Sequence, residues 1–138
     1  MNESLRCALQ KRRPQIRARW EALLRLERPQ TPLGNPDTLV FMFDQTLDEV
    51  LAALPGRPAG VVRSRTECQC DCNPMRVYFP ALEQALLEAL VLVQSEQPAL
   101  SADERVDAVA ELCGTLRRVA RREIAAFDGL CQQKTRSH

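Results

Sequence analysis

The spacing of apolar residues between Pro80 and Gln97 constrains the fold more than any other feature of the sequence. The apolar residues of this segment recur every three or four positions, which is the period of an α-helix. A main stripe is widened by further apolar positions, so that most sides of the helix are apolar. Such a helix lies at the centre of a fold, and its surplus apolar surface predicts contact with a second copy of the chain as a homodimer. The main stripe is Leu82, Leu86, Leu90 and Val93, and the widening residues are Leu87, Val91 and Leu92.

The N-terminal segment, residues 3–27, has the same period but contains Pro14. A proline inside a helix removes a hydrogen bond and clashes with the preceding turn. We therefore expect either a kinked helix or a short helix before residue 13 and a longer one that starts at Pro14. One face of this segment carries Ile16, Trp20, Leu23 and Leu24.

Two further segments begin with helix-capping residues. Asn35 followed by Pro36 opens a helix that Pro55 and Gly56 end. Its predicted stripe is Leu39, Phe43, Leu47, Val50, Leu51 and Leu54. Ser101 and Glu104 form a capping box for a last helix that runs to about Gln132. Its predicted stripe is Val106, Val109, Cys113, Leu116, Ala120, Ile124, Phe127 and Cys131.

The central helix has its own start signals in Asn73 and Pro74, but Pro80 follows closely. We expect Pro80 to interrupt it, with residues 74–79 forming a separate turn. The fold class is therefore all-α: a four-to-five-helix antiparallel bundle in one domain, residues 1–138. A long loop at 55–73 joins helices 2 and 3, and the tail at 133–138 frays.

The long loop contains the sequence TECQCDCNPM, in which Cys68, Cys70 and Cys72 alternate with polar residues. Three thiolates suit zinc or Cu(I), so these cysteines are candidate metal ligands and either ion is a candidate cofactor. The paired C-x-x-C spacing of common zinc sites is absent from the chain. A fourth zinc ligand would come from Asp71, Cys7, Cys113, Cys131 or water.

The same cysteines have two other interpretations. Cys72 immediately precedes a predicted helix start, where the helix dipole and nearby arginines favour a reactive thiolate. The three residues are then redox thiols. In the third interpretation they belong to an ordinary surface loop without a special role.

Little in the sequence favours catalysis, so we expect a protein that is not an enzyme. The single histidine, His138, is the last residue of the sequence. No phosphate-binding glycine loop or G-x-S-x-G nucleophile motif is present. Every Asp and Glu can be interpreted as a helix cap or as part of a solvated face.

Charge and hydropathy limit the partners. The net charge is +1, and the arginine runs at 11–19 and 117–122 lack interleaved aromatic residues, so we expect no nucleic acid. No window approaches 18 uninterrupted apolar residues and the N-terminus lacks a signal-type apolar core, so we expect no membrane and a cytoplasmic location. Trp20, Tyr78 and Phe79 either line a ligand pocket or belong to the core, and we favour the core for Trp20.

The stretch RRPQIRARWEALL at 12–24, followed by PDTLVFMFDQTLDEVLAAL at 36–54, resembles the N-terminal helical (RsbRD-type) domain of RsbT co-antagonist-like bacterial regulators. That family places an all-helical regulatory module ahead of signalling domains, whereas we expect the module to stand alone here. The resemblance implies regulation or sensing without catalysis, with a possible protein partner in signalling. It is carried by Arg13, Ile16, Trp20, Leu24, Leu39, Phe43, Leu47 and Leu51.

The sequence therefore predicts a bacterial sensor or regulatory helical bundle that acts through protein contacts and responds through its thiols. The alternative is a small zinc- or copper-binding protein that uses the C-x-C-x-C loop. Both hypotheses assign the function to Cys68, Cys70 and Cys72.

Overall fold

The computed structural model describes residues 1–26, 36–54 and 73–135, and across these ranges the chain is helical with no strand. The predicted all-α class is confirmed. The elements are α1 (Glu3–Lys11), α2 (Arg13–Leu26), α3 (Pro36–Leu39), the 3-10 turn η2 (Val40–Met42), α4 (Phe43–Ala52), α5 (Met75–Ser95) and α6 (Ala102–Thr135).

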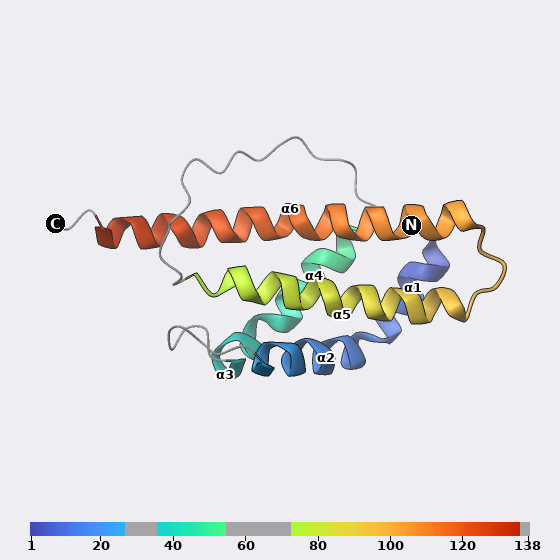
Figure 1. Ribbon diagram of the computed structural model, residues 1–138, viewed down its shortest axis with the longest axis horizontal. Coiled ribbons are helices and arrows are strands. Elements are labelled where there is room, and N and C mark those ends of the chain that lie inside the picture. Colours follow the sequence, from blue (N-terminus) through green and yellow to red (C-terminus); the bar gives the residue numbers. More distant parts are fainter. Residues whose placement is uncertain (27–35, 55–72, 136–138) are drawn as a thin grey trace.

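Helix α5 occupies the centre of the molecule (Figure 1), where it contacts α1, α2 and α6. Helix α6 runs the length of the molecule beside it. Arg76 near the start of α5 pairs with Asp128 of α6 at 2.8 Å. At the other end of α5, the Gln94 amide donates to the carbonyl of Arg105 at 3.0 Å. The two helices are therefore antiparallel.

The core combines leucine-rich faces with a compact aromatic group. The Trp20 and Phe43 rings stack with centroids 3.9 Å apart, and Tyr78 packs against Trp20 at 4.5 Å. All three side chains are fully buried, as is Leu47. Scarce aromatic residues are thus concentrated where α2, α4 and α5 meet, and aliphatic side chains fill the rest of the core.

The break near Pro14 follows the second alternative predicted from the sequence. Helix α1 ends at Lys11, and α2 begins at Arg13, one residue before Pro14. A proline in the first turn of a helix loses no intrahelical bond, because the first amides have no partner there. The side chain of Asn2 caps α1 by accepting from the amide of Leu5 at 2.8 Å.

Helix α5 differs from the prediction, because Pro80 lies inside a continuous helix rather than at its start. Pro80 deprives the helix of a single hydrogen bond close to its beginning. Tyr78 and Phe79 just before it are buried, so their packing stabilises the helical path through the proline. Asn73 does act at the helix start, since its side-chain oxygen accepts from the amide of Met75 at 3.0 Å.

The buried face of α6 is also rotated relative to the predicted stripe. Val106 is 66% exposed, whereas Ala108, Leu112 and Val119 are buried although the predicted stripe omits them. The capping box is confirmed: the Ser101 hydroxyl accepts from the Glu104 amide at 3.1 Å, and the Ser101 amide donates to Glu104 at 3.2 Å. The helix continues to Thr135, beyond the predicted end.

Helix α5 is long and apolar enough to cross a membrane by length and composition, and half of that apolar window is buried inside the fold. The central helix of a water-soluble helical protein has the same properties. This feature alone therefore does not tell a membrane-spanning helix from a buried core helix.

Arginines join the helices at their exposed edges. Arg13 pairs with Asp48 at 2.5 Å, and Arg19 with Glu88 at 2.8 Å. The hydrogen bond between Arg19 and Glu88 lowers the pKa of Glu88 and raises the pKa of Arg19. Because water screens these exposed pairs, they fix helix register more than they stabilise the fold. Further interhelical pairs are Arg12–Glu96, Arg25–Asp37, Arg117–Glu83 and Arg122–Glu49.

Candidate functional site

The predicted thiol site, Cys68, Cys70 and Cys72, lies outside the described residues, so its geometry stays a prediction. Two of the other cysteines can be placed: Cys7 is exposed on α1 and Cys113 is partly buried on α6. Burial raises the pKa of the Cys113 thiol, and the neighbouring Glu83 carboxylate adds to this shift. Within residues 1–26, 36–54 and 73–135, no three Cys, His, Asp or Glu side chains gather as a metal site.

The chain leaves the cysteine-bearing segment at a buried polar cluster of Asn73, Arg76 and Asp128, called here the Asp128 cluster. The Asp128 side chain is 0% exposed. One of its oxygens accepts from the Asn73 amide at 2.8 Å, and the other from Arg76 at 2.8 Å. Asn73 also donates to the carbonyl of Ile124 at 3.0 Å. The residue directly after Cys72 is therefore bonded to α6.

Asp128 corrects the expectation that every acidic residue caps a helix or faces solvent. The sequence does indicate that Asp128 lies on the apolar face of the helix. It follows Ile124 by four positions, so the two residues share one helix face. A carboxylate on a buried face needs charged or amide partners. Arg76 and Asn73 provide them from the antiparallel neighbour.

The three aromatic residues divide between the two predicted roles. Trp20 is core, and its indole nitrogen donates to the carbonyl of Tyr78 at 2.9 Å. The Tyr78 hydroxyl lies 2.7 Å from the Thr46 hydroxyl, and burial raises the pKa of Tyr78. Tyr78 and Phe79 also help to form a pocket of about 110 Å³, which α4, α5 and α6 enclose. Its other lining residues are Met42, Gln45, Thr46, Glu49, Met75, Val119 and Glu123.

The charged residues of this first pocket are already paired. Arg122 bonds Glu49 and lies 3.3 Å from Glu123. The remaining lining consists of apolar side chains, Gln45 and one hydrogen-bonded hydroxyl pair. The pocket is small, and its charged groups have partners within the protein.

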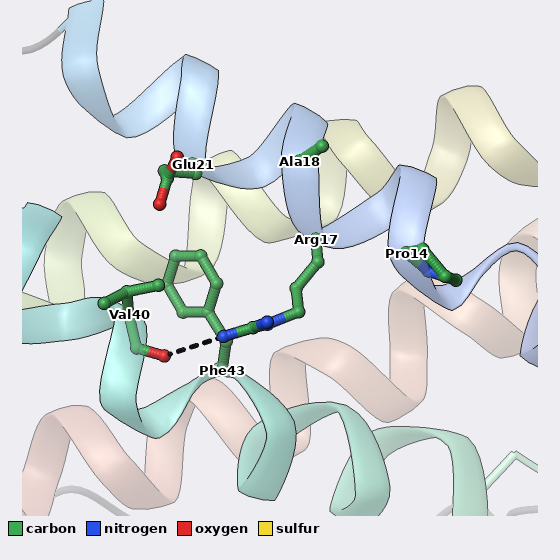
Figure 2. Close-up of a pocket in the computed structure, with 6 residues that line it drawn as sticks. All are labelled: Pro14, Arg17, Ala18, Glu21, Val40 and Phe43. Atoms are coloured by element: carbon green, nitrogen blue, oxygen red, sulfur yellow. Dashed lines mark hydrogen bonds between the residues drawn. The ribbon is translucent and has the colours of Figure 1, made fainter.

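A second pocket of about 240 Å³ lies between α2 and the chain that leads into α4 (Figure 2). Arg17 and Glu21 line it from α2, and Val40 and Phe43 from the opposite side, with Pro14 and Ala18 completing the wall. The Arg17 guanidinium lies 5.8 Å from the centre of the Phe43 ring, within the range of a cation–π contact. Sequence periodicity did not indicate this pocket, because it treats Arg17 as part of a solvated face.

Comparisons with protein-family models, with curated proteins and with solved structures found no match for this chain.

Proposed function

We propose that this protein is a non-enzymatic regulatory protein, an antiparallel helical bundle that acts through protein contacts in the bacterial cytoplasm. Its first partner is a second copy of itself, and its cysteine-bearing segment is the responsive element. The proposal agrees with the resemblance to the N-terminal domain of RsbT co-antagonist-like regulators. The observation that carries it is the apolar face of α5 that no described helix covers.

This α5 outer face consists of Val77, Leu87, Glu88, Val91 and Leu92, and the exposed Gln84 lies among them. Val91 is 59% exposed and Leu92 is 53% exposed, although both lie on the central helix. Val77 is 40% exposed, and Leu87 is partly buried. Exposed aliphatic side chains grouped on one helix are typical of an interaction surface.

The charge on this face favours a second copy of the chain as its partner. Glu88 is its only charged residue, and Arg19 pairs with that carboxylate at 2.8 Å. Two copies that meet symmetrically place identical surfaces together, so an unpaired charge there would repel its counterpart. Because Arg19 neutralises Glu88, the apolar residues can meet without this cost.

The Asp128 cluster supports a responsive role for the cysteine-bearing segment. Asn73 follows Cys72 directly, and its side chain bonds both the start of α5 and the end of α6. A change at Cys68, Cys70 or Cys72, whether oxidation or metal binding, would pull on Asn73. Helix α5, which carries the outer face, and helix α6 beside it would then be displaced.

The dimer is tested by light scattering coupled to size-exclusion chromatography. We expect the unmodified chain to elute with the mass of a dimer, and Leu92→Lys to elute as a monomer with unchanged helix content. The matched control is Phe41→Lys, because Phe41 is 87% exposed on η2, away from α5. A monomeric unmodified chain, or a Leu92→Lys variant that stays dimeric, contradicts the proposal.

The responsive element is tested by the same measurement after mild peroxide. We expect the monomer–dimer balance to shift in the unmodified chain and to stay constant when Cys68, Cys70 and Cys72 are all replaced by Ser. Elemental analysis of protein purified without chelator separates the redox from the metal alternative. A bound metal that disappears in the triple variant would favour the zinc- or copper-binding protein.

A further inference from the structure

The pocket shown in Figure 2 has one charged wall and one apolar wall. Helix α2 places Arg17 and Glu21 one turn apart on the charged wall. Val40 and the ring of Phe43 face them from the other side of the opening. A cation, an anion and an apolar surface therefore border the same space, which is about 240 Å³ in volume.

Arg17 has hydrogen-bonding capacity that the described part of the protein leaves unused. Its Nε is buried and has no hydrogen-bond acceptor among the described residues. Its Nη2 donates to the Val40 carbonyl at 3.4 Å, close to the upper limit for a hydrogen bond. Arginine forms its strongest interactions when two parallel N–H groups meet one carboxylate.

The nearby carboxylate of Asp44 does not fill this role. Its oxygen lies 3.4 Å from Arg17 Nε in an ion-pair contact that lacks hydrogen-bond geometry. Arg13 approaches the same oxygen at 3.5 Å and also bonds the backbone carbonyl of Asp44 at 2.8 Å. Asp44 is therefore shared. Because Arg17 Nε is buried, a ligand carboxylate would meet the terminal Nη nitrogens of this partly exposed guanidinium.

Glu21 supplies the opposite charge at the same opening. Its only neighbouring cation among the printed ion pairs of the described residues is Arg25, at 3.7 Å, which is too far for a hydrogen bond. A ligand with a carboxylate alone would meet repulsion from Glu21, and a ligand with an amine alone would meet repulsion from Arg17. A ligand with both groups would satisfy both residues.

We propose that this pocket binds a small zwitterion, an α-amino acid with an aliphatic side chain. The ligand carboxylate accepts from Arg17, its ammonium donates to Glu21, and its aliphatic part packs on Phe43 and Val40. At about 30 Å³ per liquid water, the volume holds roughly eight water molecules, which matches the size of such an amino acid. A ligand with so few atoms binds with a Kd on the order of millimolar.

Trp20 provides a direct readout, because it is the only tryptophan and its ring stacks on Phe43 at 3.9 Å. L-leucine is titrated while Trp20 fluorescence is recorded, with calorimetry as a second measurement. L-leucinamide lacks the carboxylate, and 4-methylpentanoate lacks the amine. We expect saturable binding of L-leucine and at least tenfold weaker binding of both analogues.

Variants separate the two charged contacts. Arg17→Gln should weaken L-leucine binding at least tenfold, whereas Arg121→Gln, at an exposed position of α6, should leave it unchanged. Glu21→Gln should weaken L-leucine binding but strengthen that of 4-methylpentanoate, because it removes a like charge. Circular dichroism checks the fold of each variant, and Arg17→Lys, which keeps the charge but loses the paired donors, should bind several-fold more weakly.

Two results would overturn the proposal. One is the absence of saturable L-leucine binding to the unmodified chain by either measurement. The other is binding that Arg17→Gln and Glu21→Gln leave unchanged, which would place the ligand elsewhere. Neither result bears on the α5 outer face, so this inference and the proposed dimer fail or survive separately.

Discussion

Tyr78 joins three helices through two separate hydrogen bonds. Its backbone carbonyl on α5 accepts from Trp20 of α2, and its hydroxyl bonds Thr46 of α4 at 2.7 Å. Both side chains are buried, so each hydroxyl depends mainly on the other for a hydrogen bond. A buried polar group that loses its partner costs about 1–3 kcal/mol, more than the net gain from forming the bond.

We therefore expect Tyr78→Phe and Thr46→Val each to lower the free energy of unfolding by about 1–3 kcal/mol. The double variant should cost less than the sum of the two, because it leaves no unpaired hydroxyl behind. Urea denaturation of all four proteins measures this coupling. Strictly additive effects would mean that the two hydroxyls do not depend on each other.

Single residues also mark where sequence reasoning succeeds. Trp20 was expected in the core, and it is fully buried. Asp128 was missed, because an acidic residue on an apolar stripe is interpreted as exposed unless its partners are known. Its partners, Asn73 and Arg76, are more than 50 positions away. Helical periodicity contains no information on contacts over that distance.

At the scale of elements, the sequence predicts the buried face of the helix within 35–54 better than the buried face of α6. Every residue of the stripe predicted for 35–54 is buried. Helix α6 contacts both α4 and α5, so its buried face includes positions between the two. Thr115 and Ala108 belong to that face, although neither is a large apolar residue. The predicted stripe followed a single face that starts at Val106, so it included this exposed residue and omitted the buried Leu112 and Val119.

Pro80 gives a test at this scale, since it lies inside α5 and is exposed. Replacing it with Ala restores one backbone hydrogen bond and removes the clash with the preceding turn. A proline in a helix interior costs about 3 kcal/mol relative to Ala, and its rigidity in the unfolded chain returns about 0.4–1 kcal/mol. We expect Pro80→Ala to raise the free energy of unfolding by about 2 kcal/mol.

The control for this prediction is Pro14→Ala. Pro14 is also exposed but lies in the first turn of α2, where its missing amide has no intrahelical partner. This change should leave stability equal or slightly lower. Thermal and urea unfolding of both variants make the comparison. If the two prolines gave the same result, Pro80 would not be limiting the stability of α5.

At the scale of the whole molecule, the all-α class followed from the four periodic segments, whereas the neighbours of each helix did not. Those neighbours are fixed by side chains that lie far apart in the sequence. Arg19 meets Glu88 and Arg76 meets Asp128, and both pairs link helices that periodicity treats separately. The pocket at Arg17 has the same origin, because its walls come from α2 and from the chain that enters α4.

The Asp128 cluster connects the end of the cysteine-bearing segment to α6. Removing the Asp128 carboxylate tests this connection. Asp128→Ala leaves the amide of Asn73 and the guanidinium of Arg76 without their shared acceptor. Because Arg76 is 37% exposed, water partly replaces the lost contact. We expect the free energy of unfolding to fall by about 1–3 kcal/mol.

A stability change alone would not show a connection, so the decisive measurement is native-state hydrogen exchange. Amides at the start of α5, Met75 to Phe79, should exchange faster in Asp128→Ala than those near Val93, because only the first turn loses its tie to α6. Asp107→Ala, an exposed acid on the same helix, is the matched control and should change neither region. Uniform acceleration along α5 would show that Asp128 contributes to global stability without anchoring the end of the segment.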